Sequence, residues 1–320
     1  MRTKERFTGF SARVRVMGDL MMTDKTKKKM LLAVDGSENS LEIVRYAAKI
    51  PAFREMATVL YNVRSKIPEG YWDLEKNSSA AWRISEARVW EKEHDKVIQG
   101  CMRKAEKMLQ VAGFHKESIE VKIHNRKQGF ARDIAKEAER GYDGVLVGRK
   151  GVSDLKDLVL GSIATKLIEK ISFVPILVVG ENPQTGSVLL ALDGSDYARR
   201  AVDYVGKVLG GGDYAARLIH VIRSDNPEYV NEIKMEMNGV FDEARGALII
   251  SGFNPDRITT KIITGARSRA AAVAQEAREG GYGTIVVGRR GLSRVRDFLM
   301  GRVSNKLIHL AKNQAVWVVN

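Results

Sequence analysis

Short apolar runs alternate with helical patterns along the chain, and the whole alternation occurs twice. Such runs, bounded by polar or turn residues, predict buried strands. In the first half they occupy 30–34, 57–63, 119–124, 144–148 and 175–179. In the second half they occupy 188–192, 216–221, 258–263, 284–288 and 315–319. Helical periodicity separates the strands, in the first half at 39–50, about 79–112, 129–140 and 161–171.

The order of these elements predicts the fold class. Strands that alternate with helices form parallel sheets joined by right-handed crossovers. We therefore expect an α/β protein of two tandem doubly wound domains. Each has a five-stranded, mostly parallel sheet with helices on both faces. Ligands of such sheets bind beyond the carboxyl ends of the strands, where the strand order reverses.

The two halves are copies of one unit. "MLLAVDGSENSLEIVRYAAKI" (30–50) matches "VLLALDGSDYARRAVDYVGKV" (188–208), an offset of 158 residues. A later glycine loop repeats at an offset of 140, so the first copy carries an insertion, which we place at about 65–97. The polar "GENPQTG" (180–186) is the predicted linker. We expect domains at 29–181 and 186–320, after a basic and disordered extension at 1–28.

The repeated glycine loop is the clearest chemical signal. "GRKGVSDLKDLVLGS" (148–162) and "GRRGLSRVRDFLMGR" (288–302) share the spacing G-x2-G-x9-G. Each loop follows a strand and opens a helix, where free N–H groups and the helix dipole favour phosphate. The Ser162 hydroxyl could add a contact, and Arg149 could either screen phosphate charge or point into solvent. The loops match neither the P-loop nor G-x-G-x-x-G, which disfavours kinase, Ras-like and dinucleotide readings.

Asp35 ends the first strand, one strand-end away from the loop. Its carboxylate could accept hydrogen bonds from ribose hydroxyls or an adenine amine. It could equally form an Asx-turn or cap the helix that follows. The residues alone leave these two roles open.

Together these motifs resemble the nucleotide-binding branch of the universal stress protein family over residues 29–320. Gly148, Gly151, Gly161 and Ser162 match its loop, and Asp35 and Asp193 match its acidic residue. The resemblance implies a Rossmann-like, adenine-nucleotide-hydrolase-like fold and ATP as the ligand, with or without Mg²⁺. It also implies an internal pseudo-dimer in which 175–179 pairs antiparallel with 315–319.

The resemblance and the strand ends give the expected nucleotide contacts. In the first domain these are Ala33, Asp35, Gly36, Ser37, Val63, Val147, Gly148, Arg149, Gly151, Gly161, Ser162 and Ile163. In the second domain they are Asp193, Val221, Gly288, Gly291, Gly301 and Arg302.

The second copy departs from the family pattern because Arg302 stands where Ser or Thr is expected. Arg302 could bind a phosphate bidentately and alter the ligand. It could instead fill the phosphate pocket or swing out to solvent. Our hypothesis is that the second site binds ATP more weakly or not at all, so the first domain is the better nucleotide site.

Composition limits the remaining functions. The net charge is +14, and residues 1–28 hold eight Lys/Arg against three Asp/Glu. We interpret this surplus as a solvated surface and tail, because no recognition motif favours nucleic acid. The chain has no apolar run long enough for a membrane span and no secretory core. Cys101 is its single cysteine, so we expect no internal disulfide and a cytoplasmic location.

The sequence indicates neither a catalytic residue nor a metal site. The five histidines are scattered, and we interpret His220 as a core or rim residue. We therefore predict an ATP-binding protein of stress response or signalling, with slow hydrolysis at most. One alternative is a weak ATPase. Another is a protein or nucleic-acid interaction module. We expect Trp82 and Trp90 of the insertion to cover apolar surface, but in this module they could form a binding face. An unidentified protein partner and a homodimer beyond the pseudo-dimer both stay open.

Overall fold

The computed structural model describes residues 28–66, 81–150, 160–292 and 300–320. The basic extension, part of the insertion and Gly151 therefore lie outside the described residues. The strands are β1 (Lys29–Ala33), β2 (Ala57–Arg64), β3 (Ile119–Asn125), β4 (Gly144–Gly148), β5 (Ile176–Val179), β6 (Ser187–Ala191), β7 (Ala215–Val221), β8 (Ile258–Ile263), β9 (Thr284–Gly288) and β10 (Ala315–Val319). The helices are α2 (Leu41–Ala48), α4 (Ala81–Val111), α5 (Phe130–Ala138), α6 (Ser162–Lys170), α7 (Asp196–Leu209), α8 (Pro227–Ile250), α9 (Arg269–Glu279) and α10 (Arg302–Leu310).

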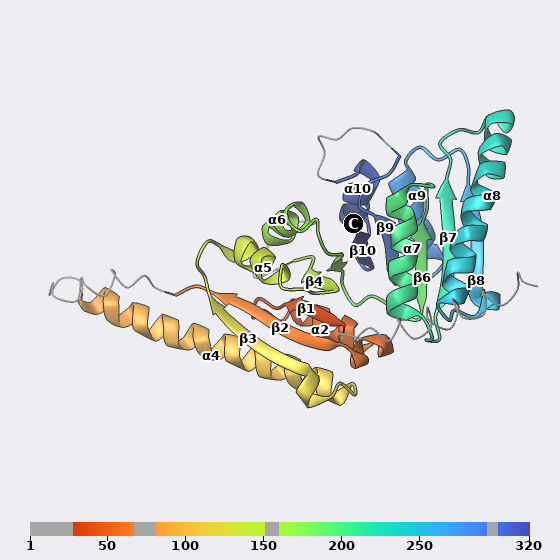
Figure 1. The fold of residues 1–320 in the computed structure, drawn as a ribbon. Helices are drawn as coiled ribbons and strands as arrows, with labels where there is room; N and C mark the ends of the chain where they lie inside the picture. The colour runs from red at the N-terminus through yellow and green to blue at the C-terminus, as the bar shows by residue number, and fades with distance from the viewer. Residues whose placement is uncertain (1–27, 67–80, 151–159, 293–299) are drawn as a thin grey trace, which may run out of the picture.

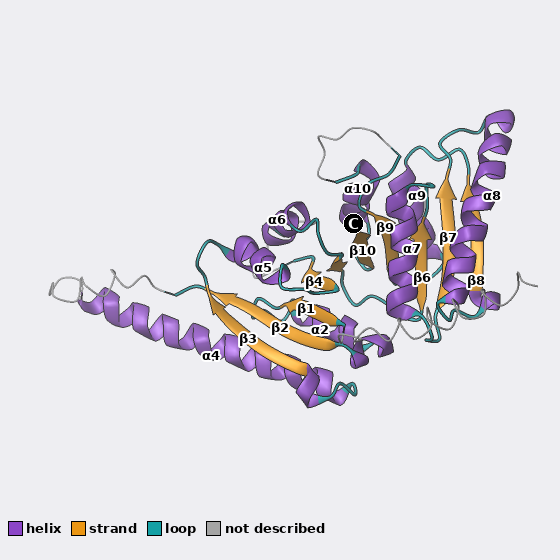
Figure 2. Ribbon diagram, viewed as in Figure 1, coloured by secondary structure: helices purple, strands orange, loops and turns teal. Residues whose placement is uncertain are grey.

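The strands of both halves join into one ten-stranded sheet with the order β3-β2-β1-β4-β5-β10-β9-β6-β7-β8. Each half is parallel, and the halves meet where β5 and β10 pair antiparallel, with Val178 opposite Val316. The predicted α/β class and internal pseudo-dimer are confirmed. Figure 1 shows the two halves side by side, and Figure 2 shows the strands flanked by helices.

Two apolar cores cover the two faces of this sheet, and each runs through both halves. One core contains side chains of α2, α4, α7 and α8 together with Leu32 and Leu190. The other contains side chains of α5, α6, α9 and α10 together with Leu31 and Leu189. Adjacent strand residues thus face opposite layers, as the pleat of a sheet covered on both sides requires.

A buried polar cluster fastens the halves on the first face. The Tyr46 hydroxyl of α2 lies 2.7 Å from Thr284 Oγ1 of β9 and accepts a hydrogen bond of 2.9 Å from Trp317 Nε1 of β10. The Trp317 ring stacks on Phe53 with centroids 6.2 Å apart. Because these side chains come from both copies, neither half buries its apolar surface alone.

The insertion of the first copy lengthens the helix after β2. α4 has 31 residues, whereas its counterpart α8 has 24. Figure 1 shows the amino-terminal part of α4 extending beyond the sheet. Trp82 is 58% exposed and Trp90 is 52% exposed, so these rings do not cover the core. The Trp90 ring instead stacks on His94, one turn along the helix, at 4.9 Å.

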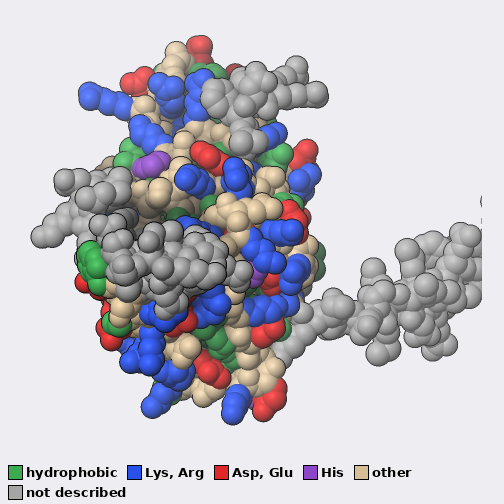
Figure 3. Space-filling view, turned by 90° about the vertical axis from the view of Figure 1, so that its left-hand side faces the viewer, with side chains coloured by type: hydrophobic (Ala, Val, Ile, Leu, Met, Phe, Trp, Pro, Cys, Tyr) green, Lys and Arg blue, Asp and Glu red, His purple; other side chains and the backbone are tan. Residues whose placement is uncertain are grey.

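Charges of both signs are interspersed on one face of the molecule. On the face that Figure 3 shows, Lys and Arg side chains are spread with Asp and Glu side chains among them. This distribution agrees with the interpretation of a solvated charged surface.

Candidate functional site

A cavity of about 430 Å³ opens at the carboxyl edge of the second half of the sheet. It lies beyond the ends of β6, β7 and β9, beside the amino terminus of α10. All six residues predicted for this domain line it: Asp193, Val221, Gly288, Gly291, Gly301 and Arg302. Small-molecule sites typically have volumes of roughly 300–1,000 Å³. The structure thus brings the predicted residues together around a space of ligand size.

Asp193 occupies the turn between β6 and α7. Its Oδ1 accepts hydrogen bonds from Ser195 N, at 3.1 Å, and from Ser195 Oγ, at 2.6 Å. Gly194 between them has φ of +77°, a left-handed conformation that glycine adopts without strain. The turn therefore uses one carboxylate oxygen. The other, Oδ2, lies against Gly291, where any Cβ would collide with it.

Three titratable side chains that the sequence did not single out as contacts also line the cavity: His220, Arg269 and Arg290. His220 Nδ1 lies 2.7 Å from the carbonyl oxygen of Leu192, and burial lowers the pKa of this histidine. It is thus the hydrogen-bonded rim residue that the sequence suggests. Arg269 Nε donates to the carbonyl of Val221 at 3.2 Å. The sequence repeat could have identified His220, because it aligns His220 with Asn62 of the first copy. Asn62 Nδ2 donates to the carbonyl oxygen of Val34, which is the counterpart of Leu192.

The first domain has the same turn at the carboxyl edge of its strands. Asp35 Oδ1 accepts from Ser37 N, at 2.9 Å, and from Ser37 Oγ, at 2.6 Å. The Asx-turn left open by the sequence is therefore present in both copies, with the second carboxylate oxygen not used by the turn. Strand pairing places Ala33 beside Val147 and thus brings the Asp35 turn next to Gly148. Val63 and Val147 are buried at their strand ends.

The start of α6 completes the first site. Gly161 is its N-cap, Ser162 and Ile163 begin the helix, and Gly161 N donates to the carbonyl oxygen of Arg149 at 2.8 Å. Gly301 N makes the same bond to Arg289 in the second copy. Each loop is therefore closed at its base, between the residue after the strand and the residue before the helix.

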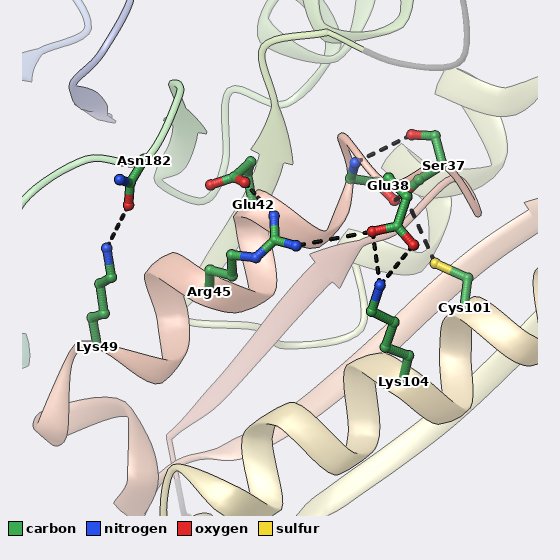
Figure 4. Close-up of polar contacts among 9 residues, drawn as sticks. Ser37, Glu38, Glu42, Arg45, Lys49, Cys101, Lys104 and Asn182 are labelled. Atoms are coloured by element: carbon green, nitrogen blue, oxygen red, sulfur yellow. Dashed lines mark hydrogen bonds and ion pairs between the residues drawn. The ribbon is translucent and has the colours of Figure 1, made fainter.

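Helix α4 packs behind the turn that follows Asp35, and Figure 4 shows its Cys101 and Lys104 side chains directed toward Ser37 and Glu38. Glu38 accepts hydrogen bonds of 2.7 and 2.8 Å from Lys104 Nζ of α4 and lies 3.9 Å from Arg45. Cys101 of α4 donates to the carbonyl of Ser37 at 3.8 Å, and burial raises the pKa of its thiol. Cys101 therefore supports the turn and is a poor nucleophile, because the thiolate is the reactive form.

The structure corrects the role predicted for the Arg149 side chain. Arg149 is 4% exposed, and its guanidinium donates to the carbonyl oxygen of Ile308 at the end of α10, in the other domain. Burial lowers the pKa of Arg149 to about 10. The side chain thus points neither to the phosphate position nor into solvent. The carbonyl groups at a helix end carry partial negative charge, and they draw the guanidinium into the interface.

Arg289 makes the reciprocal contact. Its guanidinium donates to the carbonyls of Ile168 and Ile171, at 2.6 and 2.7 Å, at the end of α6. Each loop therefore holds the helix of the opposite domain. This connection was not visible in the sequence.

No group of three or more His, Cys, Asp or Glu side chains in the described ranges could hold a metal ion. No helix in these ranges is long and apolar enough to cross a membrane.

Comparisons with known proteins agree with this geometry. Two doubly wound halves, each with a glycine loop and an acidic turn at its carboxyl edge, define a tandem doubly wound α/β protein. The family model described as "Universal stress protein family" matches residues 27–180 and again 185–320. The chain therefore belongs to the universal stress protein family. A comparison with curated proteins found no match.

Two solved structures show the same fold over nearly the whole chain. A universal stress protein from Archaeoglobus fulgidus is 20% identical, with a TM-score of 0.62, and the match covers 92% of this chain and 99% of that one. A putative universal stress protein from Pseudomonas aeruginosa is 15% identical, with a TM-score of 0.55, covering 92% and 93%. A universal stress protein in complex with cAMP is 25% identical over 42% of this chain and 95% of its own, with a TM-score of 0.32.

Proposed function

We propose that this universal stress protein binds adenine nucleotides at the carboxyl edge of each half and acts as a nucleotide-responsive stress or signalling protein. The observation that carries this proposal is the cavity of about 430 Å³ in the second domain, lined by the acidic turn, the glycine loop and the first turn of α10. The first domain repeats the acidic turn and the closure of the loop at its base. A nucleotide needs acceptors for its ribose and donors for its phosphates. The cavity supplies both.

Asp35 and Asp193 would bind the ribose through the carboxylate oxygen that each turn leaves unused. Backbone N–H groups of the glycine loops and of the helix starts would bind the phosphates, assisted by the helix dipole. We assign ATP to the first domain because Ser162 preserves the hydroxyl of the family loop there. Mg²⁺ would enter with the ATP phosphates, since the donors at the site suit phosphate rather than a free cation.

Binding rather than turnover is the proposed activity. Phosphoryl transfer needs a positioned base or water. At each crevice the acidic residue is already engaged by the serine two residues further on. We therefore propose slow hydrolysis at most, and a response in which bound ATP shifts the populations of the protein's conformations.

An interaction module is the second candidate function. The exposed Trp82 and Trp90 on one face of α4 favour it, because large exposed apolar side chains often mark contact surfaces. In this candidate a protein partner would bind α4, and nucleotide would be incidental.

Calorimetric titration of the full chain with ATP tests the proposal. Asp35→Asn keeps the acceptor of the Asx-turn but replaces the unused carboxylate oxygen with an amide. Hydrogen bonds to charged groups contribute about 1.5–3 kcal/mol, so this variant should bind ATP roughly ten- to hundredfold more weakly. Asp193→Asn should leave the tight ATP site intact, and Asp196→Asn, an exposed aspartate of α7, serves as the control. The proposal fails if the wild-type protein binds no ATP, or if Asp35→Asn binds it unchanged.

A further inference from the structure

The first part of α4 extends beyond the core of its domain. Asp95 pairs with Arg64, the last residue of β2, at 2.6 Å, and this ion pair marks where α4 passes the end of the strand. Residues 81–94 precede that point, which at about 1.5 Å of rise per residue gives a projection of roughly 20 Å. Figure 1 shows this part of the helix beyond the sheet. Among the described side chains of α4, the buried ones all belong to its second half: Ile98, Met102, Ala105 and Leu109.

An apolar stripe runs along the exposed side of α4. Trp82, Val89, Trp90 and Val97 are each more than half exposed. The first two are seven residues apart, and so are the last two, which places all four on one side of the helix. The stripe faces away from the core. We call these four residues the α4 stripe.

The folding of a single chain does not account for the α4 stripe. Valine and tryptophan are poorer helix formers than alanine, glutamate or lysine, because a helix restricts their side chains. A helical segment without tertiary packing is also marginal in water. Apolar residues on such a segment are expected where another surface covers them.

The second copy has no equivalent stripe. A Gly-Phe pair ends each helix, at 113–114 and at 252–253, and both Phe N–H groups bond a carbonyl five residues back. When these pairs are aligned, Trp82 has no counterpart in α8. The other stripe residues align with one aromatic residue and two glutamates: Trp90 with Tyr229, Val89 with Glu228, and Val97 with Glu236. The continuous apolar stripe is therefore particular to α4.

Charged residues on the same side of α4 are arranged by sign. Glu86 and Glu93 lie among the stripe residues, and Lys107 lies near the other end of the helix. All three are exposed and are separated by multiples of seven residues, so they share one side. The midpoint between Glu86 and Lys107 falls beside Val97. Lys96, at the same level, would be within reach of Glu93 in an adjacent antiparallel helix.

This arrangement of charges is complementary to itself. Two α4 helices packed antiparallel about an axis near Val97 place Glu86 of each opposite Lys107 of the other. In the same register Trp82 of each meets the exposed Val111 of the other. Antiparallel packing also sets the two helix dipoles in opposite directions. Parallel packing would place like charges against each other.

We propose that α4 is a dimerisation element, through which two copies of this chain associate with their α4 helices antiparallel. The contact is isologous, because the same face of both copies forms it about a two-fold axis. Since the stripe faces away from the core, the two first domains lie on opposite sides of the helix pair. The inference names the partner of α4 and is independent of nucleotide, so its failure would leave the proposed nucleotide binding standing.

Sedimentation equilibrium of the full chain over a concentration series measures this association. We expect a monomer–dimer equilibrium. Trp90→Ala combined with Val97→Ala should raise the dissociation constant about thirtyfold, because a tryptophan near the centre of an interface is a typical hot spot. Alanine is the best helix former, so α4 stays folded and the circular dichroism should match that of the wild type. Met235→Ala removes an exposed apolar side chain of α8 instead and is the control, which should dimerise like the wild type.

Charge reversal tests the antiparallel register. Glu86→Lys and Lys107→Glu should each weaken the dimer about tenfold, because each reversal replaces two exposed attractive pairs with repulsive ones. The chain that carries both reversals should regain the wild-type association. An equimolar mixture of the two single variants should also dimerise, since each supplies the charge that the other needs.

Three results would overturn the inference. The first is a chain that stays monomeric over the whole concentration series. The second is a dimer that Trp90→Ala with Val97→Ala leaves unchanged, or that Met235→Ala weakens to the same extent, because the interface would then lie elsewhere. The third is a dimer that neither charge reversal weakens, because the helices would then not be packed antiparallel in this register.

Discussion

Replacing Arg289 with methionine is the sharpest test of how the two domains are joined. Arg289 is 2% exposed, lies in the loop of the second domain, and donates to two carbonyls at the end of α6 in the first. Methionine keeps much of the buried volume but leaves the carbonyls of Ile168 and Ile171 without these donors. The perturbation therefore removes the contact rather than the packing.

The expected change in the free energy of unfolding results from two opposing contributions. Each lost hydrogen bond to a charged donor costs about 1.5–3 kcal/mol. Removing a buried charge returns part of this cost, because the guanidinium no longer has to be desolvated. We therefore expect a net loss of about 2–4 kcal/mol in the free energy of unfolding, which for a protein of this size lowers Tm by roughly 5–10 °C.

Urea unfolding and hydrogen exchange provide the assay. Exchange should accelerate in the last turn of α6, a helix in the opposite domain from the substitution. Arg278→Met, at an exposed position of α9, serves as the control and should change neither quantity. The reasoning would be refuted if Arg289→Met were as stable as this control, or if the loss of protection stayed within the second domain.

Three further predictions concern single positions. Gly288→Ala should lower Tm more than Gly148→Ala, because its Cβ would lie 2.6 Å from the Tyr197 backbone, whereas that of Gly148 would lie 3.2 Å from Lys150 O; equal losses in thermal unfolding would contradict this. Burial lowers the pKa of His220, so the stability of its neutral form is present above about pH 6.5 and is lost as the pH falls. His220→Asn, which copies Asn62, should therefore lose less stability than the wild type between pH 7 and pH 5, and parallel pH profiles in urea would count against it. Tyr46→Phe should cost about 1–3 kcal/mol, since Trp317 Nε1 loses its acceptor in the buried interface, and an unchanged urea midpoint would argue against that role.

The strands of each half could be predicted from the sequence because buried parallel strands are short, apolar and separated by helices. The predicted strands 144–148, 258–263, 284–288 and 315–319 coincide with β4, β8, β9 and β10, and the bounds of the other six strands differ by one residue at one or both ends. The antiparallel joint of β5 and β10 came from the family resemblance, since no local pattern distinguishes an edge strand from a paired one.

The contacts of Arg149 and Arg269 could not be predicted from the sequence. Arg149 stands in a glycine loop beside a lysine. These neighbours suggest that its side chain either screens phosphate charge or points into solvent. Its actual partner, Ile308 O, lies 159 residues away and exists only when the two halves are assembled. Arg269 was missed for a related reason, since it borders the cavity only after α9 is placed against β7.

The nucleotide content of the protein, purified without added nucleotide, tests the central claim most directly. The protein is denatured, and the supernatant is analysed by chromatography and quantified against protein. We predict ATP in an amount equal to one site per chain, held by the first domain, and its loss in Asp35→Asn. An amount equal to two ATP per chain would contradict the difference between the domains. Protein that carries no nucleotide and also binds none on titration would contradict the account as a whole.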